Sequence, residues 1–203
     1  MKNKNVKKAN AVVVVAHPDD EIIWMGGFIL KYQEYKWTIL TLCRASDKDR
    51  APKFYRVAKY LNAKGIMADL DDEDKLSLKQ TLPEIKKILK VKLPKQNFDY
   101  FFTHGSNGEY GHPRHKGAHM VIKDMVKSGE IKTNNLYFFN YEKKTKKEFA
   151  PPLAKDSSDF VLKLTKAEYT KKKGVMSEIY GFDPNGIDAS YCTNPEAFKK
   201  FKL

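Results

Sequence analysis

The chain has 203 residues, of which 41% are hydrophobic and 12% aromatic, and it carries a formal net charge of +13. This length and composition are typical of one globular domain, and no apolar run approaches the roughly 20 residues of a membrane span, so we expect no transmembrane segment. The charge comes from 34 lysines and only 4 arginines scattered along the chain, which argues against a dedicated nucleic-acid reader, although so positive a field favours an anionic substrate.

The N-terminal residues 1–10 form a basic tail that lacks the apolar stretch and the cleavage site of a secretory signal. We therefore expect a cytoplasmic protein with a single domain over residues 11–203. The only cysteines, Cys43 and Cys192, are too few for a disulfide framework, so we expect both thiols to be reduced.

Apolar runs typical of strands alternate with amphipathic stretches typical of helices. We predict strands at 11–16, 37–43, 65–70, 98–104, 135–142 and 160–165. We predict helices at 21–35, 50–62, 82–92, 115–129 and 166–180. This order predicts a Rossmann-like α/β fold, a three-layer sandwich with a mostly parallel sheet and helices on both faces. The turn-rich end, residues 181–203, follows neither pattern and receives no assignment.

The first predicted strand runs directly into a histidine and three acids, in the order His17, Pro18, Asp19, Asp20, Glu21. Acids at the start of a helix are stabilised by the helix dipole, so a purely structural interpretation is an acid-capped helix. That interpretation explains neither His17 nor the need for three acids. In an open parallel sheet, ligands bind at the carboxyl ends of the strands, where this segment is predicted to lie.

A second polar segment follows the predicted strand at 98–104. It contains four of the five histidines of the chain: His104, His112, His115 and His119. The fifth is His17. Two loops at one sheet edge can meet at one point, as a metal site with ligands from separate segments requires. The sequence therefore predicts a metal site between these two loops.

The chemistry of the two segments suggests a division of roles. Zinc would take His17, Asp20 and His115 and keep open positions for water and substrate. A bound water would have its pKa lowered to about 7, and Asp19 would accept its proton as general base. His112, three residues before His115, would donate to a developing oxyanion. The same donor set also suits ferrous iron.

The two segments resemble the signatures of the LmbE-like or PIG-L family of zinc-dependent N-acetylglucosamine deacetylases. The first signature, AHPDDE, stands unbroken at 16–21, and the second, of the form GxYGHPDH, appears as GEYGHPRH at 108–115. The resemblance implies a Rossmann-like fold and hydrolysis of the acetamide of an N-acetylamino sugar. It also implies the same ligands and the same base, with His112 as a charged electrophile.

One residue departs from the family pattern. Arg114 stands where the family often has an aspartate between the two histidines. Because an acid there can orient a neighbouring histidine, the arginine either changes the electrostatics of His112 or grips an anionic substrate.

Further candidates for substrate contact lie in two loops. Asp47 and Arg50 follow the second predicted strand, where capping of a helix is the equally good alternative. Asn107, Glu109 and Tyr110 lie in a glycine-flanked loop, where turn formation is the alternative. His104, at a strand end, either supports the metal ligands or is a capped core histidine, which is the simpler interpretation. His119, one helical turn after His115, is within reach of a metal in principle, but three ligands are already supplied and a packing or solvent-facing role is simpler.

The leading hypothesis is a zinc-dependent N-deacetylase of a small-molecule amino-sugar conjugate, neutral or anionic. One alternative is the same chemistry on another small amide, such as a thiol-cofactor precursor or an antibiotic. Another is a non-catalytic protein that binds a polyanion through its basic surface. The sequence is compatible with a homo-oligomer and does not determine the number of subunits.

Overall fold

The computed structural model of the chain describes residues 8–73, 75–95, 97–147 and 149–202. Residues 1–7 of the predicted basic tail lie outside this range. Among the described residues, no helix is both long enough and apolar enough to cross a membrane.

A seven-stranded sheet has the order β3-β2-β1-β4-β5-β9-β8. Its first five strands pair in parallel, whereas β9 pairs antiparallel with both β5 and β8. Their bounds are β1 Asn10–Val15, β2 Lys36–Thr41, β3 Lys64–Met67, β4 Tyr100–Thr103, β5 Leu136–Phe139, β8 Phe160–Leu162 and β9 Glu196–Lys200. The predicted mostly parallel sheet is therefore confirmed.

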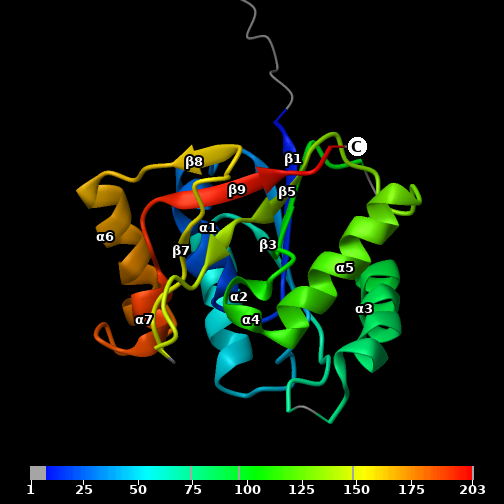
Figure 1. The fold of residues 1–203 in the computed structure, drawn as a ribbon, viewed down its shortest axis with the longest axis horizontal. Coiled ribbons are helices and arrows are strands. Elements are labelled where there is room, and N and C mark those ends of the chain that lie inside the picture. Colours follow the sequence, from blue (N-terminus) through cyan, green and yellow to red (C-terminus); the bar gives the residue numbers. More distant parts are fainter. Residues whose placement is uncertain (1–7, 74, 96, 148, 203) are drawn as a thin grey trace, which may run out of the picture.

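Helices cover both faces of the sheet (Figure 1). Their bounds are α1 Asp20–Lys31, α2 Arg50–Tyr60, α3 Leu78–Lys92, α4 Gly108–Gly111, α5 Pro113–Lys127, α6 Lys166–Gly174, the π-helix η1 Val175–Ile179 and α7 Ile187–Tyr191. Because side chains alternate along a strand, Val13 and Val15 of β1 pack on the layer of α1 and α2, and Val12 and Val14 pack on the layer of α3 and α5. The continuous valine run thus gives β1 two apolar faces, one for each helix layer.

The prediction for residues 135–142 is only partly correct. The run divides at Asn140, with β5 in the main sheet and β6 (Tyr141–Glu142) paired with β7 (Leu153–Ala154) in a separate two-stranded sheet. The parallel pairs with β4 end at Phe138, and the backbone N–H of Asn140 donates to the carbonyl of Ala197, next to the antiparallel pair of Phe139 with Phe198 in β9. The apolar run predicts the strand but not the point at which it leaves the main sheet.

The unassigned end of the chain contains both α7 and β9. The sequence EAFKK of β9 has no alternation and no apolar run, so its strand character depends on the two neighbours between which it inserts. The final strand also supplies Glu196, whose carboxylate accepts hydrogen bonds from the backbone N–H groups of Gly27 and Phe28, each at 2.7 Å. Those amides follow Met25, where α1 is kinked (φ −150°, ψ 20°). Lys172 of α6 pairs with Glu196 at 2.9 Å, and both side chains are fully buried.

Candidate active site

The carboxyl ends of β1 and β4 bring the two polar segments together. The strands are parallel neighbours, with Val14 paired to Thr103, so the residues after each strand emerge at the same edge of the sheet. His17 follows β1, Asp20 begins α1 and His115 lies in the first turn of α5. The loops after β1 and β4 therefore meet at this edge, as the sequence predicts.

Three ligand-type atoms form a nearly equilateral triangle at this edge. The Asp20 Oδ2 atom lies 3.2 Å from Nδ1 of His17 and 3.3 Å from Nε2 of His115, and the two nitrogens are 3.4 Å apart. Ligand atoms about 2.0–2.1 Å from a tetrahedral zinc ion are themselves about 3.3 Å apart. Two imidazoles and one carboxylate at these separations therefore fit zinc, and the donor set also suits ferrous iron.

The second nitrogen of each of these histidines contacts a carboxylate. Nε2 of His17 lies 2.7 Å from Oδ1 of Asp72, and Nδ1 of His115 lies 2.6 Å from Oε2 of Glu109. A carboxylate on the far nitrogen holds the proton there and leaves the near nitrogen free to bind a metal. Both rings are thus oriented with their ligand nitrogens toward the triangle.

His104 lies beneath the site and is held as a neutral ring. The backbone N–H of Ala16 donates to its Nε2 at 2.9 Å, so its Nδ1 carries the proton and donates to Glu109 at 2.8 Å. Its lone pair is therefore used within the core, while its ring stacks on that of His115 at 3.8 Å and shares the Glu109 carboxylate with it, so His104 both packs in the core and supports His115. His119 donates from Nδ1 to the carbonyl of His104 at 3.0 Å and packs on Phe138, which also matches the prediction.

Asp19 sits in a conformation that few non-glycine residues adopt, with φ 131°. Its backbone N–H donates to Oε2 of Glu21 at 3.0 Å, and Glu21 in turn accepts from the hydroxyl of Tyr180 at 2.5 Å. Arg50 reaches the Asp19 carboxylate, with 3.0 Å between its Nη1 and Oδ2. The third acid of the motif therefore holds the first one in place, which answers why one capping acid is not enough.

His112 caps the start of α5 with its ring. Its Nδ1 accepts from the backbone N–H of Arg114 at 3.2 Å, and one nitrogen of each of His17, His112 and His115 lies within 4.8 Å of the others. Because Nδ1 is an acceptor, a neutral His112 carries its proton on Nε2. The ring is thus available as a hydrogen-bond donor beside the triangle.

The electrostatics of the triangle favour a cation. Burial lowers the pKa of both ligand histidines, but nearby carboxylates outweigh it and raise the pKa of His17 to about 10 and that of His115 to about 9. Burial raises the pKa of Asp20, but the two histidines outweigh it and hold that pKa well below its usual range. A site that holds protons this firmly on its imidazoles also stabilises a metal ion that replaces them.

The neighbouring groups shift in different directions. Burial and the charge of Asp20 raise the pKa of Asp19 well above its usual value, against the opposing effects of His17 and Arg50. Burial, together with the charges of His115 and His17, lowers the pKa of His112 to about 3. The lowered pKa of His112 favours a neutral ring.

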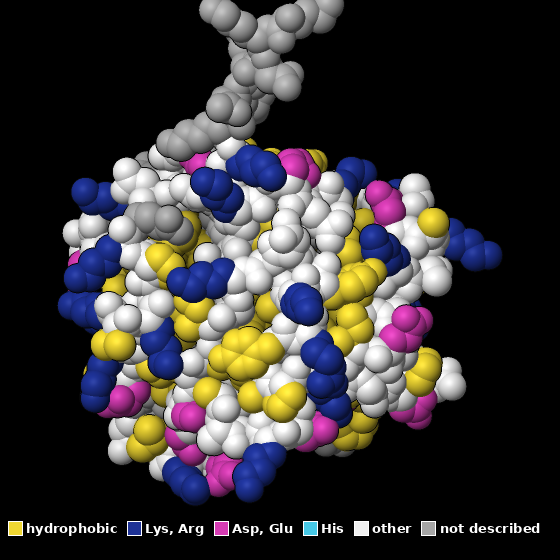
Figure 2. Space-filling model, turned by 180° about the vertical axis from the view of Figure 1, so that it is seen from behind, with side chains coloured by type: hydrophobic (Ala, Val, Ile, Leu, Met, Phe, Trp, Pro, Cys, Tyr) yellow, Lys and Arg dark blue, Asp and Glu magenta, His cyan; other side chains and the backbone are white. Residues whose placement is uncertain are grey.

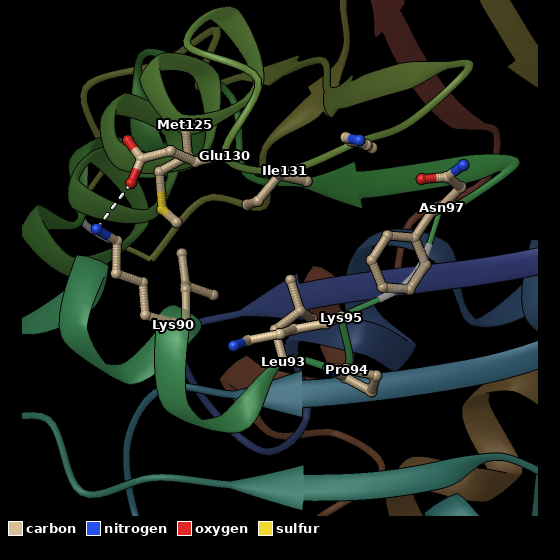
Figure 3. A pocket seen from close by; sticks show the side chains of 11 residues that line it. Lys90, Leu93, Pro94, Lys95, Asn97, Met125, Glu130 and Ile131 are labelled. Carbon is tan, nitrogen blue, oxygen red and sulfur yellow. Dashed lines mark ion pairs between the residues drawn. The ribbon is translucent and has the colours of Figure 1, made fainter.

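A pocket of about 320 Å³ opens onto the triangle. Aromatic side chains Trp24, Tyr110 and Tyr191 and the cations of Arg44 and Arg50 form much of its wall. A larger hollow of about 540 Å³ lies between the C-terminal ends of α3 and α5 (Figure 3). Its lining, which includes Met125, Ile131 and the ion pair of Lys90 with Glu130, has no histidine, so we place the chemistry in the smaller pocket.

The predicted substrate contacts have different outcomes. Arg50 and Tyr110 line the pocket. Asp47 does not: its Oδ1 accepts from the backbone N–H groups of Asp49 and Arg50, both at 2.9 Å, so it caps α2 as the alternative interpretation held.

Three other predicted contacts point away from the pocket. Asn107 donates to the carbonyl of Tyr141 at 2.8 Å, and Glu109 is only 1% exposed beneath the two histidines that it contacts. Arg114 is also buried and contacts Asp71 instead of lining this pocket. For these three residues the sequence prediction of substrate contact does not agree with the structure.

The sequence prediction missed several pocket residues: Trp24, Arg44, Asp72, Asp188 and Tyr191. Asp72 lies in the acidic run that begins at Asp69. The position of this run, directly after a predicted strand, is the sequence signal that could have placed Asp72 at the site. Asp188 and Tyr191 belong to α7, a helix that no local sequence pattern predicts. Trp24 donates from Nε1 to Oδ1 of Asp20 at 2.8 Å and so occupies the second oxygen of that carboxylate.

The basic surface shows no stripe on the face seen in Figure 2. Lys and Arg side chains are scattered there among acidic and apolar ones. A nucleic-acid footprint is typically a patch or stripe of clustered cations.

Comparisons with known proteins agree with this geometry. The family model described as "PIG-L: GlcNAc-PI de-N-acetylase" matches residues 12–126. The uncharacterized protein L374 of Acanthamoeba polyphaga mimivirus is 25% identical over 161 residues, which cover 71% of this chain and 68% of that protein.

Two solved structures show the same fold at low identity. The N,N'-diacetylchitobiose deacetylase from Pyrococcus horikoshii has a TM-score of 0.64 at 16% identity, over 96% of this chain and 85% of that one. GalB, the 4-carboxy-2-hydroxymuconate hydratase from Pseudomonas putida KT2440, has a TM-score of 0.64 at 16% identity, over 96% and 97% of the two chains. One fold therefore supports both a deacetylase and a hydratase, so the reaction has to be argued from the site.

Proposed function

This chain belongs to the PIG-L family of GlcNAc-PI de-N-acetylases, and from that premise we propose that it is a zinc-dependent hydrolase that removes the acetyl group from an N-acetylglucosamine-type conjugate. The observation that carries the proposal is the triangle of Nδ1 of His17, Oδ2 of Asp20 and Nε2 of His115, with sides of 3.2–3.4 Å. We further propose that residues 11–203 form one domain, because β9 and β8 extend the same sheet as β1. The cytoplasmic location stays a prediction.

His17, Asp20 and His115 would hold the metal ion. When bound, zinc lowers the pKa of a coordinated water to about 7 and polarises the carbonyl of the amide. The remaining chemistry belongs to side chains of the chain itself.

Asp19 is the proposed general base. Its carboxylate lines the pocket next to the triangle and is oriented by Arg50. A base must be ionised. Burial and the charge of Asp20 raise the pKa of Asp19 well above its usual value, so the proposed role depends on nearby positive charge such as that of His17 and Arg50, which opposes this rise. Asp19 would accept a proton from the attacking water and return it to the amine nitrogen as the C–N bond breaks, which yields acetate and a free amine.

His112 is the proposed oxyanion donor. The resemblance implies a charged imidazole, in which both nitrogens would donate. Here Nδ1 accepts from the backbone N–H of Arg114, so we propose a neutral ring that donates from Nε2 as negative charge develops on the carbonyl oxygen. Loss of one such donor typically lowers kcat by about 100- to 1000-fold.

The pocket suits a sugar ring. Tyr110 lies 5.4 Å from Tyr191 and 6.3 Å from Trp24 between ring centroids, which gives an aromatic wall on one side. A pocket of about 320 Å³ is at the small end of the range of roughly 300–1,000 Å³ for ligand sites. We propose a small amino-sugar conjugate, neutral or anionic, as the substrate.

The test is release of free amine from a panel of N-acetylamino sugars and their neutral and anionic glycosides, with zinc-loaded wild-type protein and an Asp19→Asn variant. We expect release by the wild type, a loss of about 100-fold or more in the variant, and equal zinc content in both. Full activity of Asp19→Asn would overturn the assignment of the base. Absence of release from every panel member, with zinc bound, would redirect the search to other small amides or to a polyanion-binding role.

A further inference from the structure

Arg114 lies between His112 and His115, where the resembling motif has an acid. Its side chain is only 1% exposed, and it extends toward the segment 69–73 that follows β3. We call residues 69–73 the acidic segment. A charged group this deeply buried is stable only where it is paired and hydrogen-bonded.

Asp71 of the acidic segment and Leu76, just after that segment, supply contacts of this kind. The guanidinium Nη2 lies 2.8 Å from Oδ2 of Asp71 and donates to the carbonyl of Leu76 at 3.1 Å. Nε donates to the backbone carbonyl of Asp71. Because these contacts include both the side chain and the backbone of Asp71, the arginine fixes the path of the chain and not only one carboxylate.

The next residue, Asp72, reaches the metal centre. Its Oδ1 lies 2.7 Å from Nε2 of His17, and its Oδ2 accepts from Nε of Arg44 at 2.8 Å. With its proton held on Nε2, His17 directs the lone pair of Nδ1 toward Asp20 and His115. A shift of the acidic segment would release the ring of His17 to rotate away from the triangle.

The two ligand histidines are therefore supported in different ways. The partner of His115 is Glu109, six residues before it and buried with it. The partner of His17 comes from 55 residues away, on a partly exposed segment between a strand and a helix. Such a segment needs a fixed anchor if it is to hold a ring within hydrogen-bond distance.

We propose that Arg114 is a positioning residue of the metal centre: by clamping Asp71 it holds Asp72 on Nε2 of His17 and so presents Nδ1 of His17 to the metal. This inference rests on the proposed function, because it assumes that the triangle binds a metal ion. It assigns to the arginine of the second motif a role on the first motif, across the sheet edge.

The test measures zinc affinity in the absence of substrate, by competition with a chromogenic chelator. Asp72→Asn is expected to raise the dissociation constant for zinc by about 10- to 100-fold, the usual cost of losing such a partner. Arg114→Met is expected to act in the same direction. The double variant Arg114→Met/Asp72→Asn is expected to be no weaker than Asp72→Asn alone, because both changes break one chain of contacts.

The matched control is Glu73→Gln, which removes one charge from the same segment. Glu73 is exposed and pairs with Lys75 at the surface, so the Glu73→Gln variant should bind zinc with the same affinity as the wild type. Asp71→Asn serves as a second clamp variant that leaves the arginine in place, with a smaller loss of affinity expected. Absorption spectra of the cobalt-loaded proteins should change for Asp72→Asn and not for Glu73→Gln.

The inference is overturned if Asp72→Asn binds zinc as tightly as the wild type, or if the effects of Arg114→Met and Asp72→Asn add in full. It is also overturned if Glu73→Gln weakens zinc binding as much as Asp72→Asn does. Failure of the wild type to bind zinc or cobalt at all is a different result, because it removes the metal centre and with it the proposed function.

Discussion

The segment matched by the family model, residues 12–126, and a later segment, residues 140–202, contribute to the protein in different ways. The first contains most of β1 and all of β2 to β4, which pair in parallel, and every atom of the proposed metal triangle of His17, Asp20 and His115. The second contains the antiparallel strands β8 and β9 and the short helix α7. From α7 come two walls of the pocket, Asp188 and Tyr191.

The difference indicates a division of labour between chemistry and shape. The proposed metal ligands and the proposed base lie on loops that follow parallel strands, where small displacements would disrupt a metal site. The later segment sets the width of the pocket and supports α1 from behind through Glu196.

The largest expected effect is on folding and comes from the second segment. Glu196→Ala leaves Lys172 as an unpaired buried charge and the amides of Gly27 and Phe28 without an acceptor. We expect the free energy of unfolding, measured by chemical denaturation, to fall by about 3–5 kcal/mol. Glu34→Ala, an exposed Glu→Ala change, is the control.

A loss for Glu196→Ala no larger than that for Glu34→Ala would show that the kinked helix does not depend on the later segment. Replacing both partners, as Lys172→Met/Glu196→Gln, should destabilise the protein less than Glu196→Ala alone, because no buried charge is left unpaired.

A smaller effect is expected at the wall of the pocket. Tyr191→Ala removes an aromatic ring that lies 5.4 Å from that of Tyr110, so we expect KM for the amino-sugar substrate to rise about tenfold, equivalent to about 1.4 kcal/mol. The zinc dissociation constant should not change. Tyr55→Ala, on the exposed face of α2, is the matched control. If Tyr191→Ala weakened zinc binding and left KM unchanged, the later segment would contribute to the metal site and not to the shape of the pocket.

The smallest effect is expected at surface ion pairs that do not line the candidate active site. Lys86 and Lys90 flank Glu130 at 2.7 and 2.8 Å and, with Ser128, lower the pKa of Glu130 to about 2. A depressed carboxyl pKa stabilises the folded state above about pH 4.5, and this contribution is lost as the pH falls toward 2.

Thermal unfolding of Glu130→Gln should therefore show a slightly lower Tm than the wild type at pH 6 in low salt. The difference should shrink at pH 3 and also in high salt, because exposed ion pairs are screened. A Tm difference that is independent of pH would mean that Glu130 acts through packing and not through its charge.

Much of the site was predictable because its residues are tied to strand ends. His17, Asp20 and His115 follow or adjoin strands whose apolar runs are clear, and parallel neighbours must end at the same edge. For Glu109 and Arg114 the sequence predicts contact with the substrate, but both side chains are buried. Their partners, His104 and Asp71, are known only once the loops are folded over one another.

The sequence by itself determined the α/β alternation, the parallel core and the meeting of His17, Asp20 and His115, the proposed metal ligands, at one edge of the sheet. Each of these follows from local periodicity and from the short range between a strand end and the loop that leaves it. Only the tertiary structure decided that Asp72 supports His17, that Glu21 holds Asp19, and that β9 and α7 complete the sheet and the pocket. The physical reason is that a buried charge or a short strand takes its partner from whatever the fold brings near, often many residues away.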